Sequence, residues 1–247
     1  MTNFKSLIFI IFFLLMITTH FLYSQSLEDL ISKEENQLKL SRDKIITRIT
    51  KLPNSNTHKC QAVGVIYAPI DKIWEVINDY NHFKDFMPRI KESFIVNPSE
   101  LKEILDVRVE DWKKFGKYLK KFKLEQINGD LIYFYNRFNL PWPFKNRYYI
   151  LKMVRHPESF SFRWTQFIGN TKVNDGSWEL IPFKGSKRKT LGIYTLITDP
   201  GVAVSPSLCR FAMKITLPGT IKSVRKRMLK LFLEEKENAQ TQPFGNF

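Results

Sequence analysis

Histidine and acidic side chains are the first groups to examine for catalysis, because they exchange protons near neutral pH. The 247-residue chain has four His residues, His20, His58, His82 and His156. Asp79 and Asp85 flank His82, but this spacing is common on helix surfaces. The chain contains no G-x-S-x-G, phosphate-loop, H-E-x-x-H or paired-Cys motif. The sequence therefore predicts no catalytic constellation, no metal site and no cofactor.

A different chemistry is indicated by large apolar side chains that alternate with polar ones. Two neighbouring expected strands, 147–154 and 159–167, have this alternation. Their apolar faces carry Tyr149, Leu151, Met153, Phe162 and Trp164. Such a face either fills a solid core or lines a cavity for an apolar small molecule.

Arg147 is in register with that apolar face, so its guanidinium is expected to point inward. A buried guanidinium needs a partner. A protein carboxylate, for example that of Glu179 or Asp111, could pair with it. A ligand phosphate, carboxylate or hydroxyl could equally do so, and the residues leave both alternatives open.

The elements that position these faces follow one another in a simple order. A first strand, expected over 59–67, leads into a helix that begins at Asp71 and a short helix over 83–87. Strands are then expected over 92–97, 103–112, 118–127, 131–138, 147–154, 159–167, 178–183 and 191–198. Asn128-Gly129 predicts a hairpin turn between 118–127 and 131–138. Consecutive strands joined by short turns form an antiparallel meander.

A long helix closes the chain. Helical spacing begins near Ser207, and Pro218 kinks the helix or starts a second one. One apolar stripe consists of Leu217, Ile221, Val224, Met228 and Leu231. A meander this long curls, and we expect the helix to fill its concave side. The expected fold class is therefore α+β, a curved antiparallel sheet around a long C-terminal helix, with two short helices after the first strand.

Three segments resemble the START (steroidogenic-acute-regulatory-protein-related lipid transfer) domains. The turn Asp199-Pro200-Gly201-Val202 is similar to the D-P-G-G-like turn before the family's last helix, although Val202 replaces the second Gly. The segment from Gly64 through Trp74 to Tyr80 is similar to the family's first strand and helix. Residues 141–149, PWPFKNRYY, are similar to its P-x-P-x-x-N-R-D-Y segment, with Tyr148 where the family often has Asp.

The resemblance covers about residues 27–233 and implies the helix-grip fold of the START-like (SRPBCC) superfamily. It also implies an internal cavity that binds a lipid or other hydrophobic small molecule, in a monomeric protein that is not an enzyme. The residues expected to line the cavity are Val107, Val109, Phe122, Arg147, Tyr149, Leu151, Met153, Phe162, Trp164, Trp178, Met213 and Leu217. The alternatives are a polyketide cyclase or aromatase of the same superfamily, and an interaction module with a filled core.

The connection over 139–145, NLPWPFK, is expected to be a gate that touches a membrane. Leu140, Trp142 and Phe144 are apolar residues in a loop stiffened by two prolines. Trp favours the membrane interface. The alternative is that Trp142 folds back and plugs the end of the sheet.

The formal charge of +15 favours an anionic partner, such as an anionic membrane surface. Lysines clustered over 113–123, near Trp112 and Phe115, are also typical of nucleic-acid binding. No nucleic-acid-binding motif is present, and the expected export argues against this partner. The prediction is therefore no nucleic acid.

The first residues have the pattern of a secretory signal. Lys5 precedes the apolar run 7–17, and Ser24 or Ser26 supplies a small residue before cleavage. The expected organisation is a signal peptide over 1–24, an N-terminal helix and linker over 25–55, a START-like lipid-binding domain over 56–235 and a flexible tail over 236–247. In an exported protein, Cys60 and Cys209 either form a disulfide or remain two buried thiols.

Protein isolated from its native host is expected to begin near Gln25 or Leu27, because the signal segment is removed on export to the periplasm or medium. N-terminal sequencing measures this directly. An intact Met1 in the membrane fraction would instead identify the segment as an uncleaved membrane anchor.

Overall fold

The structure is a computed structural model that describes residues 30–107, 109–127, 129–140, 145–199, 201 and 206–241. In the last helix, side chains are described from Met213 onward, except those of Ile215 and Thr241. Residues 1–44 and 45–247 form two compact units. The first contains α2 (Glu34–Ser41), a polar helix in which Lys39 pairs with Glu35 one turn earlier. The segment over 25–55, expected to be a helix and linker, therefore also contains the first strand of the sheet, which begins at Ile46.

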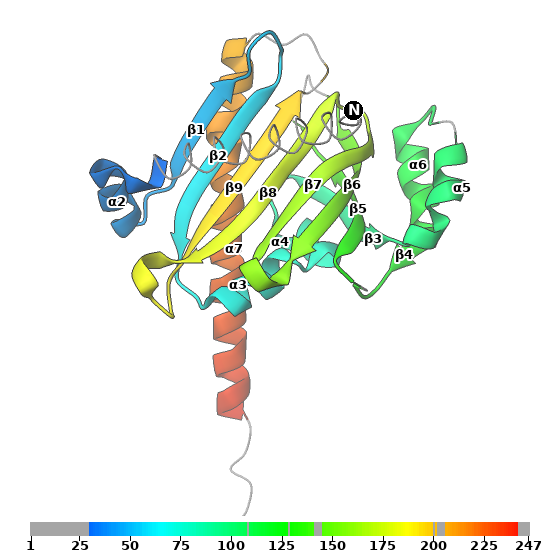
Figure 1. The fold of residues 1–247 in the computed structure, drawn as a ribbon. Helices are drawn as coiled ribbons and strands as arrows, with labels where there is room; N and C mark the ends of the chain where they lie inside the picture. The colour runs from blue at the N-terminus through cyan, green and yellow to red at the C-terminus, as the bar shows by residue number, and fades with distance from the viewer. Residues whose placement is uncertain are drawn as a thin grey trace, which may run out of the picture. The chain divides into compact units, whose positions relative to one another are not determined.

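The second unit is built on one antiparallel sheet, in which the structure describes nine strands (Figure 1). In chain order they are β1 (Ile46–Lys51), β2 (His58–Ile66), β3 (Ile90–Val96), β4 (Lys123–Leu124), β5 (Leu131–Phe138), β6 (Arg147–His156), β7 (Ser161–Gly169), β8 (Val173–Pro182) and β9 (Thr190–Asp199). Their order in the sheet is β1-β2-β9-β8-β7-β6-β5-β3-β4. The sheet is curved and does not close, so it has a concave face to fill.

Helix α7 (Pro206–Thr241) crosses the concave face, and its C-terminal part extends past the sheet (Figure 1). Leu217, Ile221 and Val224 are buried against the sheet, as their spacing predicts. Gly64 of β2 makes room for this packing, since a Cβ there would lie 2.9 Å from Cγ2 of Ile221. The short helices α3 (Ile70–Ile77) and α4 (Phe83–Phe86) follow β2. The expected helix-grip architecture is confirmed.

The strand expected over 103–112 is wrong, because this region forms α5 (Leu101–Asp106) and the start of α6 (Trp112–Leu119). Asp111 caps α6, with its Oδ1 accepting hydrogen bonds from the backbone N–H groups of Lys113 and Lys114 at 2.8 and 3.1 Å. Leu105 of α5, an apolar residue in the expected strand, is 57% exposed. The short run of alternating residues within 103–112 therefore forms the end of a helix and the loop that follows it.

The hairpin expected at Asn128-Gly129 is also wrong. Gly129 has the expected positive φ of 80°, but the preceding segment 118–127 is helical as far as Phe122 and contains only the two-residue strand β4. Strand β4 pairs with β3, which lies between β4 and β5 in the sheet. Strand β8 is longer than expected, since Asn174–Gly176 continue it rather than form a turn.

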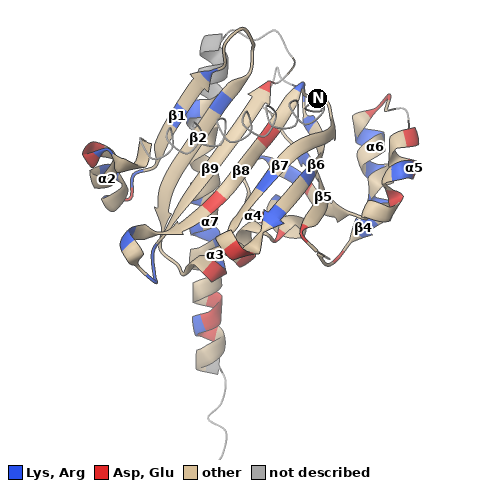
Figure 2. Ribbon diagram, in the orientation of Figure 1, with Lys and Arg blue, Asp and Glu red and all other residues tan. Residues whose placement is uncertain are grey.

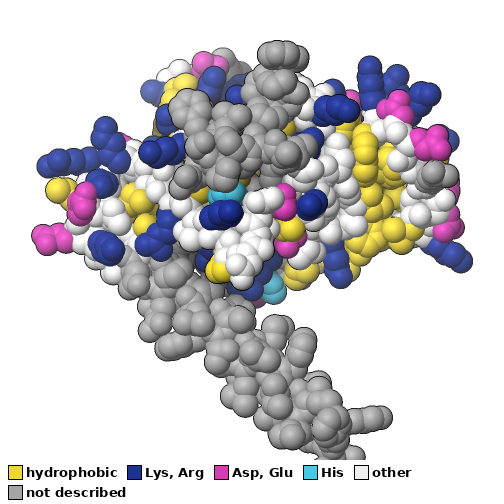
Figure 3. Space-filling view, turned by 90° about the horizontal axis from the view of Figure 1, so that it is seen from above, with side chains coloured by type: hydrophobic (Ala, Val, Ile, Leu, Met, Phe, Trp, Pro, Cys, Tyr) yellow, Lys and Arg dark blue, Asp and Glu magenta, His cyan; other side chains and the backbone are white. Residues whose placement is uncertain are grey.

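Helices α5 and α6 form a second hydrophobic cluster with β3, β5 and β6. Phe115 and Leu119 of α6 are buried there beside Phe94, Tyr135 and Ile150. Figure 3 shows hydrophobic side chains gathered on the side of the molecule that carries these two helices. The cluster is separate from the core beneath α7.

Basic residues are spread over several elements, among them β1, β2, β6, β7 and α5–α6 (Figure 2). Acidic residues interrupt them on α5 and α7. No helix within the described part of the chain has both the length and the hydropathy to cross a membrane.

Candidate functional site

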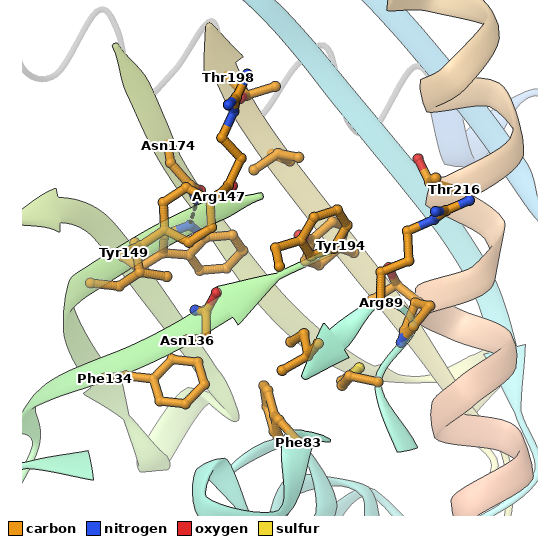
Figure 4. Close-up of a pocket in the computed structure, with 18 of the residues that line it drawn as sticks. Phe83, Arg89, Phe134, Asn136, Arg147, Tyr149, Asn174, Tyr194, Thr198 and Thr216 are labelled. Carbon is orange, nitrogen blue, oxygen red and sulfur yellow. Dashed lines mark hydrogen bonds between the residues drawn. The ribbon is translucent and has the colours of Figure 1, made fainter. Parts of the chain in front are cut away.

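A cavity of about 290 Å³ lies between the concave face of the sheet and α7 (Figure 4). Strands β5 to β9 line one side, α7 lines another, and α4 with the segment 87–90 borders it as well. Because inward and outward side chains alternate along each strand, every second residue of these strands faces the cavity. The cavity is therefore a direct product of the curved sheet and its helix.

Most of the predicted site residues line this cavity. They are Arg147, Tyr149, Leu151, Met153, Phe162, Trp164, Trp178, Met213, Leu217 and, from the expected gate, Leu140. Trp142 and Phe144 lie outside the described residues, so their gating role stays a prediction.

Val107, Val109 and Phe122 do not line the cavity, contrary to expectation. They are partly buried in the second hydrophobic cluster, with α5 and α6. Their assignment relied on strands over 103–112 and 118–127. Because Val107 and Val109 lie in the connection between α5 and α6, and Phe122 ends a short 3-10 helix, the inward-facing register inferred for them does not exist.

The apolar wall of the cavity is a packed group of aromatic rings. Trp164 stacks on Tyr194 with ring centroids 5.6 Å apart, and it lies 6.1 Å from Phe162. Its indole Nε1–H donates a 3.2 Å hydrogen bond to Oδ1 of Asn174. Gly176 makes this position possible, because any Cβ there would collide with the Trp164 ring. The wall is thus fixed in place before any ligand arrives.

One end of the cavity is polar, and Arg147 is its central residue. Arg147 is only 5% exposed; its Nη1 donates to the carbonyl of Lys145 at 3.2 Å, while its Nε has no hydrogen-bond partner. Neither expected carboxylate pairs with it. Asp111 caps α6, and Glu179 accepts a 3.3 Å hydrogen bond from Ser177 Oγ. Among the described residues, Arg147 has no acidic partner.

Two tyrosines add hydroxyl groups to the cavity. Burial raises the pKa of Tyr149 well above its usual value, even though the nearby Arg147 favours the phenolate. Burial likewise raises the pKa of Tyr194. Both hydroxyls therefore stay neutral under physiological conditions and can donate hydrogen bonds.

Several lining residues were not predicted. Asn136 lies between Phe134 and Phe138 on the inner face of β5, and the alternation of that strand would have identified it. Asn174 and Thr198 occupy the same face of β8 and β9. Arg89 carries no comparable signal, because it follows Pro88 in a connection and has a positive φ of 65°.

A curved antiparallel sheet that encloses an apolar cavity beneath a C-terminal helix defines a helix-grip protein of the START-like class. The chain belongs to the family described as polyketide cyclase / dehydrase and lipid transport, whose sequence profile matches residues 66–240. No curated protein sequence matches the chain.

Solved structures support the same fold. A STAR-related lipid transfer protein from Xanthomonas axonopodis aligns with a TM-score of 0.54 and 16% identity, over 74% of this chain and 92% of that one. Human STARD10 aligns with a TM-score of 0.55 and 13% identity, over 81% and 75% of the two chains. At these sequence identities, the similarity to the two structures shows a shared fold and no more.

Proposed function

We propose that the chain binds one hydrophobic, lipid-like molecule in the cavity and transfers or sequesters it. The observation that carries this proposal is the apolar space of about 290 Å³ between the sheet and α7. Pockets that bind small molecules are mainly apolar with a few placed polar groups. This cavity has that composition, since aromatic and aliphatic walls surround Arg147, Asn136 and Asn174. The secretory signal expected at the N-terminus favours a role after export.

The family also includes cyclases, so catalysis is the alternative function. General acid–base chemistry needs a group that titrates near neutral pH. The described residues that line the cavity include no His, Asp, Glu, Lys or Cys. The tyrosines are poor acids there, because burial raises the pKa of both Tyr149 and Tyr194. This composition supports binding over catalysis.

Filling the cavity is expected to weaken binding strongly without unfolding the protein. Thr216 of α7 lines the cavity and is only half-buried (Figure 4), so Thr216→Trp places an indole in the ligand space at little packing cost. Affinity for a fluorescent fatty acid or sterol probe should fall roughly tenfold or more, since a ligand must displace the ring. The measurement is a fluorescence titration with a thermal melt on the same preparation.

The matched control is Thr165→Trp, the same substitution at an exposed position of β7. Its side chain points away from the cavity, because its neighbour Trp164 points inward. Binding should be unchanged in this variant. Equal binding by the wild type and both variants would place the ligand elsewhere, and no binding by the wild type would contradict the proposed function.

A further inference from the structure

The charged residues that line the cavity, among those the structure describes, are all positive. The described residues that line it include two arginines, Arg89 and Arg147, and no acidic residue. Arg89 is exposed at the rim, and its side chain extends toward Thr216 of α7 (Figure 4). Arg147 lies deeper, with its side chain extending toward Thr198 of β9 (Figure 4). Within the described part of the chain, no acidic residue lining the cavity neutralises this positive charge.

Arg147 is the more informative of the two, because it is buried. A guanidinium cannot lose its proton at physiological pH, so burial cannot be relieved by neutralisation. Removing it from water without a counter-charge is unfavourable. One backbone carbonyl, that of Lys145, accepts from Nη1, and Nε remains without a partner. An anion in the cavity would supply the acceptor that Nε lacks among the described residues.

Neutral hydrogen-bonding groups lie near this charge. Tyr149 neighbours Arg147 on the inner face of β6, and Asn136 lies across from Tyr149 on β5. No hydrogen bond engages the Tyr149 hydroxyl or the Asn136 amide within the described part of the chain. A planar guanidinium flanked by such donors matches the oxygens of a carboxylate or a phosphate.

The rest of the cavity determines the size and character of the apolar part of the ligand. Beyond this end the wall consists mainly of Phe, Leu, Met and Trp side chains. Its volume, about 290 Å³, lies at the small end of ligand pockets, which span about 300–1,000 Å³. Such a space suits one apolar chain or a compact ring system rather than several chains at once.

Building on the proposed function, we infer that the ligand is a single-chain amphiphile with an anionic head group, held by Arg147 at the polar end of the cavity. The apolar tail lies along Phe162 and Trp164, and the head pairs with the guanidinium. The shared chemistry is a terminal carboxylate or phosphate.

The test compares four probes that share one C18 tail, below their micelle-forming concentrations. Oleate carries a carboxylate, oleoyl lysophosphatidate a phosphate, oleyl alcohol no charge and oleylamine a positive charge. We expect wild-type protein to bind at least one of the two anions roughly tenfold more tightly than the alcohol, and the amine most weakly. Whichever anion binds more tightly identifies the head group. Calorimetric titration measures all four affinities.

Variants of Arg147 test whether this residue is the source of the preference for anionic probes. Arg147→Met should remove the tenfold preference for the anion and leave alcohol binding within about twofold, because only the charge pair is lost. Arg147→Lys should keep part of the preference, since the charge remains but the planar fork does not. The control is Arg163→Gln, at an exposed outward-facing position of β7, which should bind all four probes like the wild type.

Stability of the ligand-free protein separates this role from a purely structural one. If Arg147 awaits a ligand anion, Arg147→Met should melt at or above the wild-type temperature, because a buried unpaired charge is removed. Equal affinity of the wild type for the alcohol and both anions would overturn the inference while leaving the proposed function intact. Failure of all four probes, and of sterol, to bind would instead contradict the proposed function. An equal loss for anion and alcohol in Arg147→Met, with a lower melting temperature, would also overturn the inference.

Discussion

Replacing Trp164 with alanine is expected to lower the free energy of unfolding by about 3 kcal/mol and to weaken ligand binding roughly tenfold. Trp164 is nearly buried, stacks on Tyr194 and donates a hydrogen bond to Asn174. The loss should fall at the low end of the range for large-to-small core changes, about 3–5 kcal/mol, because the ring already borders open space. Denaturant unfolding and a probe titration measure the two effects.

Trp112→Ala is the matched control for this prediction. Trp112 packs against Tyr148 in the second hydrophobic cluster, with ring centroids 6.3 Å apart, and does not line the cavity. Its removal should lower stability without changing affinity for the ligand. A stability loss of about 5 kcal/mol in Trp164→Ala with unchanged binding would indicate a solid core in place of a binding cavity.

Replacing Ile221 with alanine is expected to cost about 2–5 kcal/mol of stability. Ile221 is fully buried at the centre of α7, and its side chain occupies the space left by Gly64 and Gly192 on the sheet. Truncation leaves a void that the sheet backbone cannot fill. The helix would then be held less firmly, and ligand retention should shorten along with the lower stability.

Leu229→Ala, on the same helix, provides the comparison. Leu229 is 60% exposed, although it lies on the same helix as the packed residues Met228 and Leu231. Its truncation should change stability by no more than about 0.5 kcal/mol. Similar losses in both variants would mean that α7 does not hold the sheet in the way described.

The concave face of the sheet could be predicted from sequence because alternation is a strong local signal. In β6 and β7, large apolar residues recur at every second position, so the inward register of Tyr149 and Trp164 followed directly. The apolar stripe of α7 was equally clear from its spacing. These long, regular elements also contribute a large part of the cavity wall.

The same signal failed where the elements are short. Val107 and Val109 alternate with polar residues, but they follow a helix of only six residues. Asp111 caps α6, and Asp is a residue type that favours helix starts, but the strand expected over 103–112 runs across it. Strand β1 was missed because the helix and linker expected over 25–55 include the β-branched run of Ile46–Lys51.

The polar end of the cavity was predicted only in part. The inward position of Arg147 followed from its register with Tyr149, but the identity of its partner did not. Whether a carboxylate lies near a guanidinium depends on the packing of elements distant in sequence. Arg89 was missed because a residue in a connection has no periodicity from which to infer its direction.

Native mass spectrometry of the protein, purified without detergent and incubated with a total lipid extract, tests the central claim most directly. The account predicts a species heavier than the polypeptide by the mass of one lipid, lost after solvent extraction and absent from Thr216→Trp. Lipid bound equally by the wild type and Thr216→Trp, or only bare polypeptide under every loading condition, would contradict a ligand-binding cavity beneath α7.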